Sequence, residues 1–224
     1  MKSLQDMSIL VTGGGSGIGL GTARYCIERG AKVTICGRRE DKIKAAASEL
    51  GDACHGVAAD ITVAADRQKL LGATIDHGGK LDALVNNAGN MYRGAITELD
   101  ETALQEVFHT NVIAAMMLTG LCTSHLAQRK GAVVFVGSIH TRRAFPGASP
   151  YAATKAAVQG LTRVLAAELG EQKIRVNCLL PGAVFTEINQ RAGLMDDETA
   201  LQRLEGMSDL HALGRIGTTE EIAE

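Results

Sequence analysis

The stretch "TGGGSGIG", residues 12–19, follows a short apolar run and opens a segment with helical spacing. Glycine permits a tight turn and lets the backbone approach a pyrophosphate closely, while the N-terminus of the next helix offers free N–H donors. Taken alone, such a turn could be a flexible connection. Between an apolar strand and a helix at the start of a βαβ unit, it predicts a dinucleotide-binding site.

The rest of the chain alternates short β-rich runs with segments of helical spacing. The runs cover residues 8–12, 31–36, 55–60, 81–86, 132–138 and 174–180. This alternation indicates βαβ units and a parallel sheet. The runs are almost continuously apolar, as expected when helices cover both faces of a sheet. The predicted fold is therefore α/β, a Rossmann-like doubly wound parallel sheet.

The length of 224 residues suits one α/β domain and is too short for two, so we expect a single dinucleotide-binding and catalytic domain over residues 1–224. The helical and strand patterns weaken only between about 183 and 213, into polar, amphipathic pieces. That stretch is too long for an ordinary connection. It predicts a lid-like excursion near the substrate.

Composition narrows the expected partners. With 46% hydrophobic residues, 21% charged residues and a formal net charge of -2, the chain has neither a polybasic nucleic-acid surface nor a disordered acidic tail. We expect a small-molecule substrate and further copies of the chain, with no nucleic acid and no membrane. The N-terminus has no signal-peptide pattern and no run approaches membrane-spanning length, which favours the cytoplasm. The five cysteines lie far apart, which favours buried, reduced thiols over a metal site.

The end of the second predicted strand reads "ICGRRE", residues 35–40. Dinucleotide-binding folds often carry an acid there for the ribose 2'-hydroxyl, but this chain has Gly37 followed by Arg38 and Arg39. A guanidinium can pair with a 2'-phosphate, whereas an acid would repel it. The pattern favours NADP(H) over NAD(H). NAD(H) stays open, because both arginines could instead be solvated or paired with Glu40 and Asp41.

Six motifs stand in one order along the chain: the glycine turn at 12–19, "NNAG" at 86–89, "HTNVIAA" at 109–115, "VFVGSI" at 134–139, "YAATK" at 151–155 and "PG" at 181–182. Together they resemble the short-chain dehydrogenase/reductase family, over residues 8–224. The resemblance implies NAD(P)-dependent oxidation of an alcohol or reduction of a carbonyl. It also implies a catalytic tetrad, on Asn111, Ser138, Tyr151 and Lys155.

The same resemblance, together with the two arginines, gives the residues expected around the cofactor. These are Gly13, Ser16, Gly17, Ile18, Gly19, Arg38, Arg39, Asp60, Ile61, Asn87, Ala88, Gly89, Tyr151, Lys155, Pro181, Gly182 and Thr186. Family members usually continue through a further helix and a final strand that closes the sheet and helps to form an oligomer. The expected sheet therefore lacks its usual last strand. The expected assembly is a homodimer or homotetramer.

The pair Tyr151 and Lys155 explains how a tyrosine could move a proton. Residues four apart share a helix face, so the lysine ammonium is expected to stabilise the phenolate and lower the pKa of the tyrosine. Tyr151 would then be the acid in reduction and the base in oxidation. Ser138 would hydrogen-bond the substrate oxygen, and Asn111 resembles the family residue that holds a water in a relay to Lys155. Alternatively, each residue could be ordinary surface or cap.

Two substrate classes are open, a 3-oxoacyl thioester and a sugar or polyol. In the loop that leads to Tyr151, the side chains of His140, Arg142 and Arg143 could bind an anionic group or could be solvated. A different class of function is a non-catalytic protein that keeps the fold and binds or senses the nicotinamide cofactor. Retention of all four tetrad residue types favours the enzyme.

Overall fold

The computed structural model describes residues 3–194 and 196–224. These residues form one sheet of six parallel strands in the order β3-β2-β1-β4-β5-β6. The strands are β1 (Ser8–Thr12), β2 (Lys32–Gly37), β3 (Cys54–Ala58), β4 (Ala83–Asn86), β5 (Ala132–Val136) and β6 (Arg175–Leu179). All six predicted runs are therefore strands. β6 pairs with β5 alone and forms an edge, which confirms a sheet that ends at its sixth strand.

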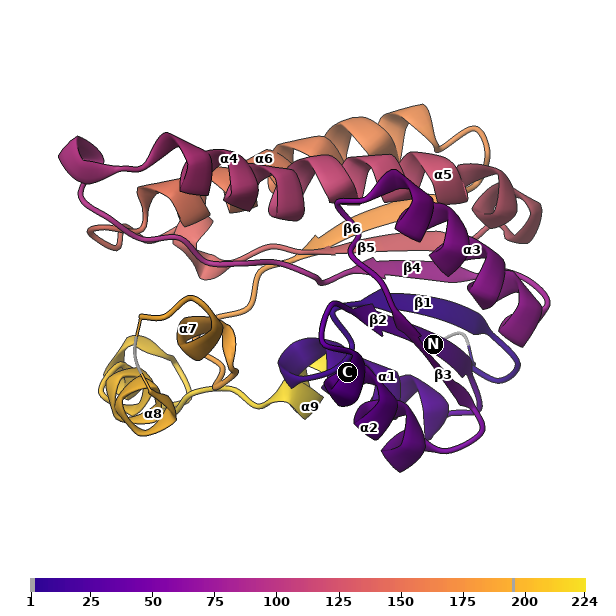
Figure 1. Cartoon of the computed structure of the whole chain (residues 1–224), viewed down its shortest axis with the longest axis horizontal. Helices are drawn as coiled ribbons and strands as arrows, with labels where there is room; N and C mark the ends of the chain where they lie inside the picture. Colours follow the sequence, from indigo (N-terminus) through magenta and orange to yellow (C-terminus); the bar gives the residue numbers. More distant parts are fainter. Residues whose placement is uncertain (1–2, 195) are drawn as a thin grey trace.

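Helices cover both faces of the sheet (Figure 1). One face carries α3 (Ala64–Gly78), α4 (Glu101–Phe108), α5 (Ala114–Arg129) and α6 (Ser149–Glu168), and the other carries α1 (Gly17–Ile27), α2 (Glu40–Leu50) and the short α9 (Thr219–Ala223). Two hydrophobic cores result, one on each face. All five residues of β1 are buried, with Leu10 in one core and Ile9 and Val11 in the other. The doubly wound sheet is confirmed.

A five-residue π-helical turn, His109–Ile113, joins α4 to α5. The combined run Glu101–Arg129 is long and apolar enough to cross a membrane, but 44% of its most apolar window is buried in the protein. A core helix of a soluble protein has the same properties, so this run is weak support for a membrane span. The π turn matters for the site because it contains Asn111.

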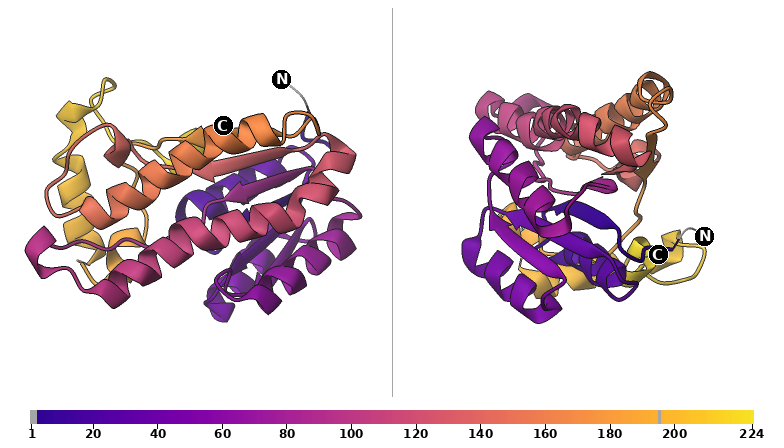
Figure 2. Two further views of the ribbon diagram at one scale, coloured as in Figure 1. Left: turned by 90° about the horizontal axis from the view of Figure 1, so that it is seen from above. Right: turned by 90° about the vertical axis from the view of Figure 1, so that its right-hand side faces the viewer.

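The predicted excursion at 183–213 contains α7 (Ile188–Arg191), α8 (Asp197–Glu205) and a single 3-10 turn (Ser208–Leu210). Figures 1 and 2 show this segment at one end of the sheet. Its two ends meet, because Val184 and Gly217 form a parallel β-bridge and the Gly217 N–H donates to the Ala183 carbonyl at 2.9 Å. Two further 3-10 turns, Ile96–Glu98 and Ile139–Thr141, lie in the loops that follow β4 and β5.

Candidate active site

The glycine turn is built against the segment that follows β4. Gly13 has a φ of +66°, and a Cβ added there would lie 2.9 Å from the Ala88 Cα. A Cβ on Gly19 would lie only 2.3 Å from the Gly13 carbonyl oxygen. The Asn87 amide donates to the Thr12 carbonyl at 2.9 Å and to the Gly13 carbonyl at 3.1 Å. The turn therefore needs glycine at these positions and is held by side-chain hydrogen bonds.

The helix that follows this turn begins without a protein cap. Ser16 is the N-cap residue of α1 in an extended conformation, and its side chain makes no capping hydrogen bond. The first N–H groups of a helix carry a partial positive charge and need acceptors. The start of α1 is thus suited to an anion such as a pyrophosphate.

One cleft, with a cavity volume of about 190 Å³, lies where the order of the strands changes direction, between β1 and β4. In open α/β sheets, ligands bind outside the carboxyl ends of the strands at this point. The structure brings thirteen of the predicted site residues to this cleft: Gly13, Ser16, Gly17, Ile18, Asn87, Ala88, Gly89, Ser138, Tyr151, Lys155, Pro181, Gly182 and Thr186. The glycine turn and the predicted acid–base residues therefore line the same cavity.

The other predicted residues do not line this cleft: Gly19, Arg38, Arg39, Asp60, Ile61 and Asn111. Gly19 packs beneath the turn, and Ile61 is buried in a hydrophobic core. The Asp60 carboxylate accepts hydrogen bonds from the N–H of Thr62 at 2.9 Å and from its hydroxyl at 2.7 Å. Asp60 is thus already engaged within its own loop.

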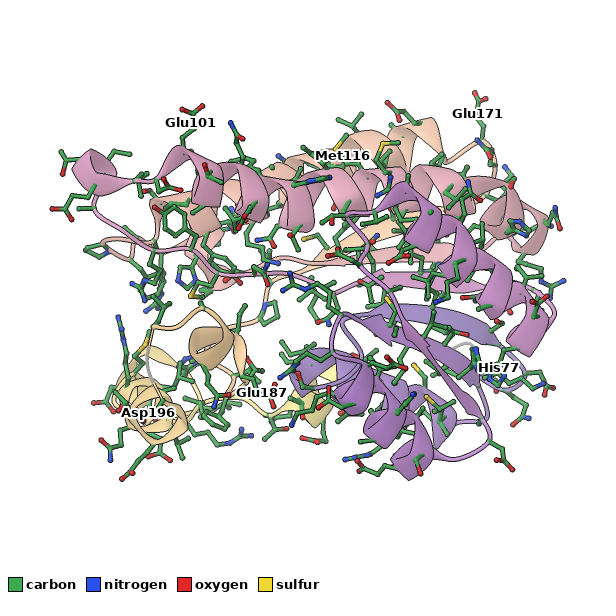
Figure 3. All side chains as sticks on the ribbon, in the orientation of Figure 1. His77, Glu101, Met116, Glu171, Glu187 and Asp196 are labelled. Atoms are coloured by element: carbon green, nitrogen blue, oxygen red, sulfur yellow. The ribbon has the colours of Figure 1, made fainter. Side chains whose placement is uncertain are left out.

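The two arginines of the cofactor prediction differ in their contacts. Both are exposed, but only the Arg39 side chain has hydrogen-bond partners among the described residues: it pairs with Glu187 at 2.6 Å and reaches the Ser16 hydroxyl at 3.5 Å. Burial raises the pKa of Glu187, but Arg39 and Lys42 outweigh it and leave that pKa below its usual value. The acid that engages Arg39 is therefore Glu187 (labelled in Figure 3) rather than the neighbouring Glu40 or Asp41.

Three tetrad side chains meet at the ends of β5 and α6. Ser138 follows β5, while Tyr151 and Lys155 occupy the first two turns of α6; all three are buried. The Lys155 ammonium donates to the Val136 carbonyl at 2.8 Å and lies 5.6 Å from the centre of the Tyr151 ring. The helix thus places both residues of "YAATK" on the face that looks into the cleft.

Burial dominates the electrostatics of this pair. It raises the pKa of Tyr151 to about 12, although a hydrogen bond with Ser138 acts in the opposite direction. Burial also lowers the pKa of Lys155 to about 8. In the protein alone, the pKa of Tyr151 therefore lies above its usual value and not below it, because burial destabilises the phenolate. The lowering by Lys155 stays a prediction.

Asn111 is buried in the π turn and connects two elements. Its Nδ2 donates to the Asn90 carbonyl at 2.9 Å and to the Thr154 hydroxyl at 3.0 Å, and its Oδ1 accepts from the Asn90 N–H at 2.8 Å. In this structure Asn111 holds the segment after β4 against α6, the helix that carries Tyr151. The predicted role in a water relay stays a prediction.

His140 also lines the cleft. Its Nδ1 lies 3.0 Å from the Ser138 Oγ, and its ring stands edge-on to the Tyr151 ring with centres 5.1 Å apart. Burial, and to a lesser degree the positive charge of Arg93, lowers the pKa of His140 to about 4. The imidazole is therefore neutral at physiological pH and cannot itself supply a cation to a bound anion.

Sequence reasoning missed two other charged residues of the cleft, Arg93 and Arg203. The loop arginines that it singled out, Arg142 and Arg143, are exposed and do not line the cavity. The only available signal for Arg93 was its place four residues after "NNAG". Nothing in the local pattern around Arg203 distinguishes it from the other charges of α8.

The short chain dehydrogenase family model matches residues 7–197. An L-fucose dehydrogenase from Bos taurus is 35% identical over 96% of this chain and 79% of its own length, and a 3-oxoacyl-(acyl-carrier-protein) reductase from Chlamydia muridarum is 34% identical over 98% and 88%. A Brucella melitensis 3-ketoacyl-(acyl-carrier-protein) reductase, solved with NADH, has a TM-score of 0.88 and 30% identity, covering 99% of this chain and 89% of that one.

Proposed function

This chain belongs to the short-chain dehydrogenase/reductase family, and on that premise we propose that it interconverts a carbonyl and a secondary alcohol with Tyr151 as the acid or base. Members are oxidoreductases that act on CH–OH groups with NAD(P). One observation supports this mechanism most directly: Ser138, Tyr151 and Lys155 line the same cleft as the glycine turn. The residues present fit a dinucleotide, since the turn excludes Cβ atoms and the start of α1 is uncapped.

When bound, the nicotinamide cofactor supplies or accepts the hydride. In reduction, the Tyr151 hydroxyl donates its proton to the substrate oxygen, and in oxidation the same oxygen takes a proton back. The Ser138 hydroxyl donates a hydrogen bond to that substrate oxygen and orients it. The Lys155 charge favours the phenolate that Tyr151 leaves behind, and its bond to the Val136 carbonyl holds the ammonium in place.

The test is NADPH oxidation with a panel of ketones, sugars and acetoacetyl thioesters. Replacement of Tyr151 by Phe keeps the buried ring and removes only the hydroxyl, so we expect at least a ~100-fold loss of kcat with unchanged cofactor binding. Tyr25→Phe is the matched control, because Tyr25 lies in α1 outside the cleft. Undiminished turnover in Tyr151→Phe would sink the mechanism.

For the cofactor, we propose a preference for NADP(H), carried by Arg38 and Arg39. Both residues stand directly before α2, and the Arg39 guanidinium reaches toward Ser16 of the glycine turn. Glu187 competes for Arg39, so a 2'-phosphate would have to displace this acid. We expect Glu187→Gln to tighten NADPH binding and Arg39→Ala to weaken it, with NADH binding little changed. Equal discrimination in wild type, Arg38→Ala and Arg39→Ala would refute the assignment and favour NAD(H).

The substrate candidates are a 3-oxoacyl thioester and a sugar or polyol. Each class has support among the relatives, one of which is named as an acyl-carrier-protein reductase and another as a fucose dehydrogenase. Acetoacetyl thioester and L-fucose in the same panel separate them by kcat/KM. A protein that binds the cofactor with no turnover on any member of the panel would instead be the non-catalytic alternative, against which retention of Ser138 and Tyr151 argues.

We also propose a homo-oligomer, a dimer or a tetramer. Large apolar side chains are exposed on the helices of one face, at Ile113, Met116, Met117 and Val164. Figure 3 shows Met116 on the outer side of α5. Light scattering of wild type and Met117→Glu tests this surface, with dissociation expected in the variant.

The five cysteines are free thiols, which supports a cytoplasmic location.

A further inference from the structure

Two arginines reach the cleft from opposite sides. Arg93 belongs to the segment between β4 and α4, and Arg203 lies in the last turn of α8. Figure 1 shows α8 across from the segment that leads out of β4. Both side chains line the cavity that contains Ser138 and Tyr151. One wall of the substrate region is therefore fixed to the sheet, and the other is carried by the excursion.

Neither arginine has an acidic partner among the residues that the structure describes. Arg93 is half-buried and donates one hydrogen bond, to the Pro146 carbonyl at 3.1 Å. Arg203 makes no ion pair within the described chain. Among the described residues that line the cleft, Glu187 is the one acid, and it is held by Arg39 at 2.6 Å and Lys42 at 3.8 Å. Glu187 is thus paired near the glycine turn, where the cofactor is proposed to bind. It does not neutralise Arg93 or Arg203, which lie where the substrate is proposed to bind.

The two positive charges act on each other. Burial lowers the pKa of Arg93 first, and the charge of Arg203 lowers it further. Like charges in a partly desolvated cleft raise the energy of the empty site, and an oxyanion between them removes that cost. Guanidinium groups also match the geometry of a carboxylate or phosphate, because each can give two parallel N–H bonds.

The surroundings of the two arginines are apolar. Met91 and Phe145 line the cavity on the side of Arg93, and Leu204 and Met207 line it beside Arg203. Such walls suit a short carbon chain rather than a hydroxyl-rich sugar, because buried hydroxyls need hydrogen-bond partners. The cleft therefore offers a reacting end at Ser138 and Tyr151, an apolar middle and a cationic end.

We propose that the substrate is a short carbonyl compound or alcohol with an oxyanion tail, a carboxylate or a phosphate, held between Arg93 and Arg203. The proposal rests on the proposed function, since it names the class of molecule that the acid–base site receives. It assigns the anion site to Arg93 and to Arg203, whose side chain is exposed at the rim of the cavity, and not to Arg142 and Arg143, which do not line the cavity. Because Arg203 belongs to the excursion, the tail would also tie α8 to the body of the protein.

The test compares anionic and neutral forms of one substrate: 4-oxopentanoate against its methyl ester, and dihydroxyacetone phosphate against dihydroxyacetone. For wild type, we expect at least a ~10-fold higher kcat/KM for the anionic member of one pair, which also tells carboxylate from phosphate. Arg93→Gln and Arg203→Gln should each lower that ratio about 10-fold, mainly through a higher KM for the anionic member. Arg142→Gln is the matched control and should keep the ratio.

Equal rates on the neutral and anionic members in wild type would overturn the proposal while leaving carbonyl reduction intact. A preference for the anion that survives in both variants would overturn it as well. If no carbonyl is reduced at all, the proposed function fails. Calorimetric titration of the cofactor complex with each anionic compound then tests the anion site separately. Binding of 4-oxopentanoate or dihydroxyacetone phosphate that Arg93→Gln abolishes would then uphold the site, and no binding of either to wild type would overturn it.

Discussion

Lys155 is a buried cation, and its replacement by methionine should stabilise the protein while removing activity. Burial lowers the pKa of Lys155 from 10.5 to about 8. One pKa unit corresponds to about 1.4 kcal/mol, so the charged lysine costs the folded state about 3 kcal/mol at neutral pH. The variant loses the hydrogen bond to the Val136 carbonyl, which is worth about 1 kcal/mol. We therefore expect a net gain of about 2 kcal/mol in the free energy of unfolding at pH 7.

The pH dependence gives this prediction its sign. Because the pKa is lower in the folded state, the unfolded chain binds more protons between pH 8 and 10.5, and the stability of wild type rises with pH across that window. The variant has no such proton to lose. Its advantage over wild type should therefore shrink by about 1 kcal/mol between pH 7 and pH 9.

Urea denaturation of wild type and Lys155→Met at both pH values measures the effect, and the difference between the two proteins removes the titration of all other groups. Lys173→Met serves as the control, because Lys173 is exposed and its replacement removes the same charge without changing the buried site. A Lys155→Met difference that stays constant from pH 7 to pH 9 would show that burial does not set the ionisation of this lysine.

Four further substitutions test the packing of the site and of the surrounding fold. Gly19→Ala places a Cβ 2.3 Å from a carbonyl oxygen and should abolish cofactor binding measured by calorimetry, whereas Gly72→Ala, with nothing within 4 Å, should raise stability by about 0.5–1 kcal/mol in urea. Asn111→Ala removes three hydrogen bonds, so it should lower the free energy of unfolding by about 2–3 kcal/mol and should also lower kcat. Full activity in this variant would contradict the role of Asn111 in holding α6. Asp82→Asn weakens the hydrogen bonds that the Asp82 carboxylate accepts from the Ser8 N–H at 2.9 Å and from the Arg129 guanidinium at 3.1 Å. The free energy of unfolding should therefore fall by about 1–2 kcal/mol, seen as a lower midpoint in urea denaturation.

The sheet was predictable because its signals are local. Each strand is a short run rich in apolar residues, fully buried in β1 and less so in β3 and in the edge strand β6. The glycine turn is recognisable from its run of residues without side chains between β1 and α1. The same locality explains why Ser138, Tyr151 and Lys155 were found: each sits at the end of an element whose bounds can be estimated from the sequence. Here the pattern within a few residues determines where the side chain lies.

The parts that escaped prediction depend on distant neighbours. Arg93 and Arg203 share a cleft only because the excursion folds back over the segment after β4, and no sequence periodicity reports that contact. The partner of Arg39 could not be identified from the sequence for the same reason, since Glu187 comes from the excursion. The raised pKa of Tyr151 in the protein alone escaped prediction because spacing reveals a neighbouring charge but not the depth of burial.

The bridge between Val184 and Gly217 closes the base of the excursion. Because the two ends of the segment are pinned together, changes in its length or sequence alter a closed loop and leave the sheet and the acid–base residues where they are. The part of this loop that follows Thr186 and Glu187, two residues that line the cofactor end of the cleft, can therefore be exchanged as a unit. Substrate range could evolve, or be engineered, by grafting another such unit there without redesign of the catalytic machinery.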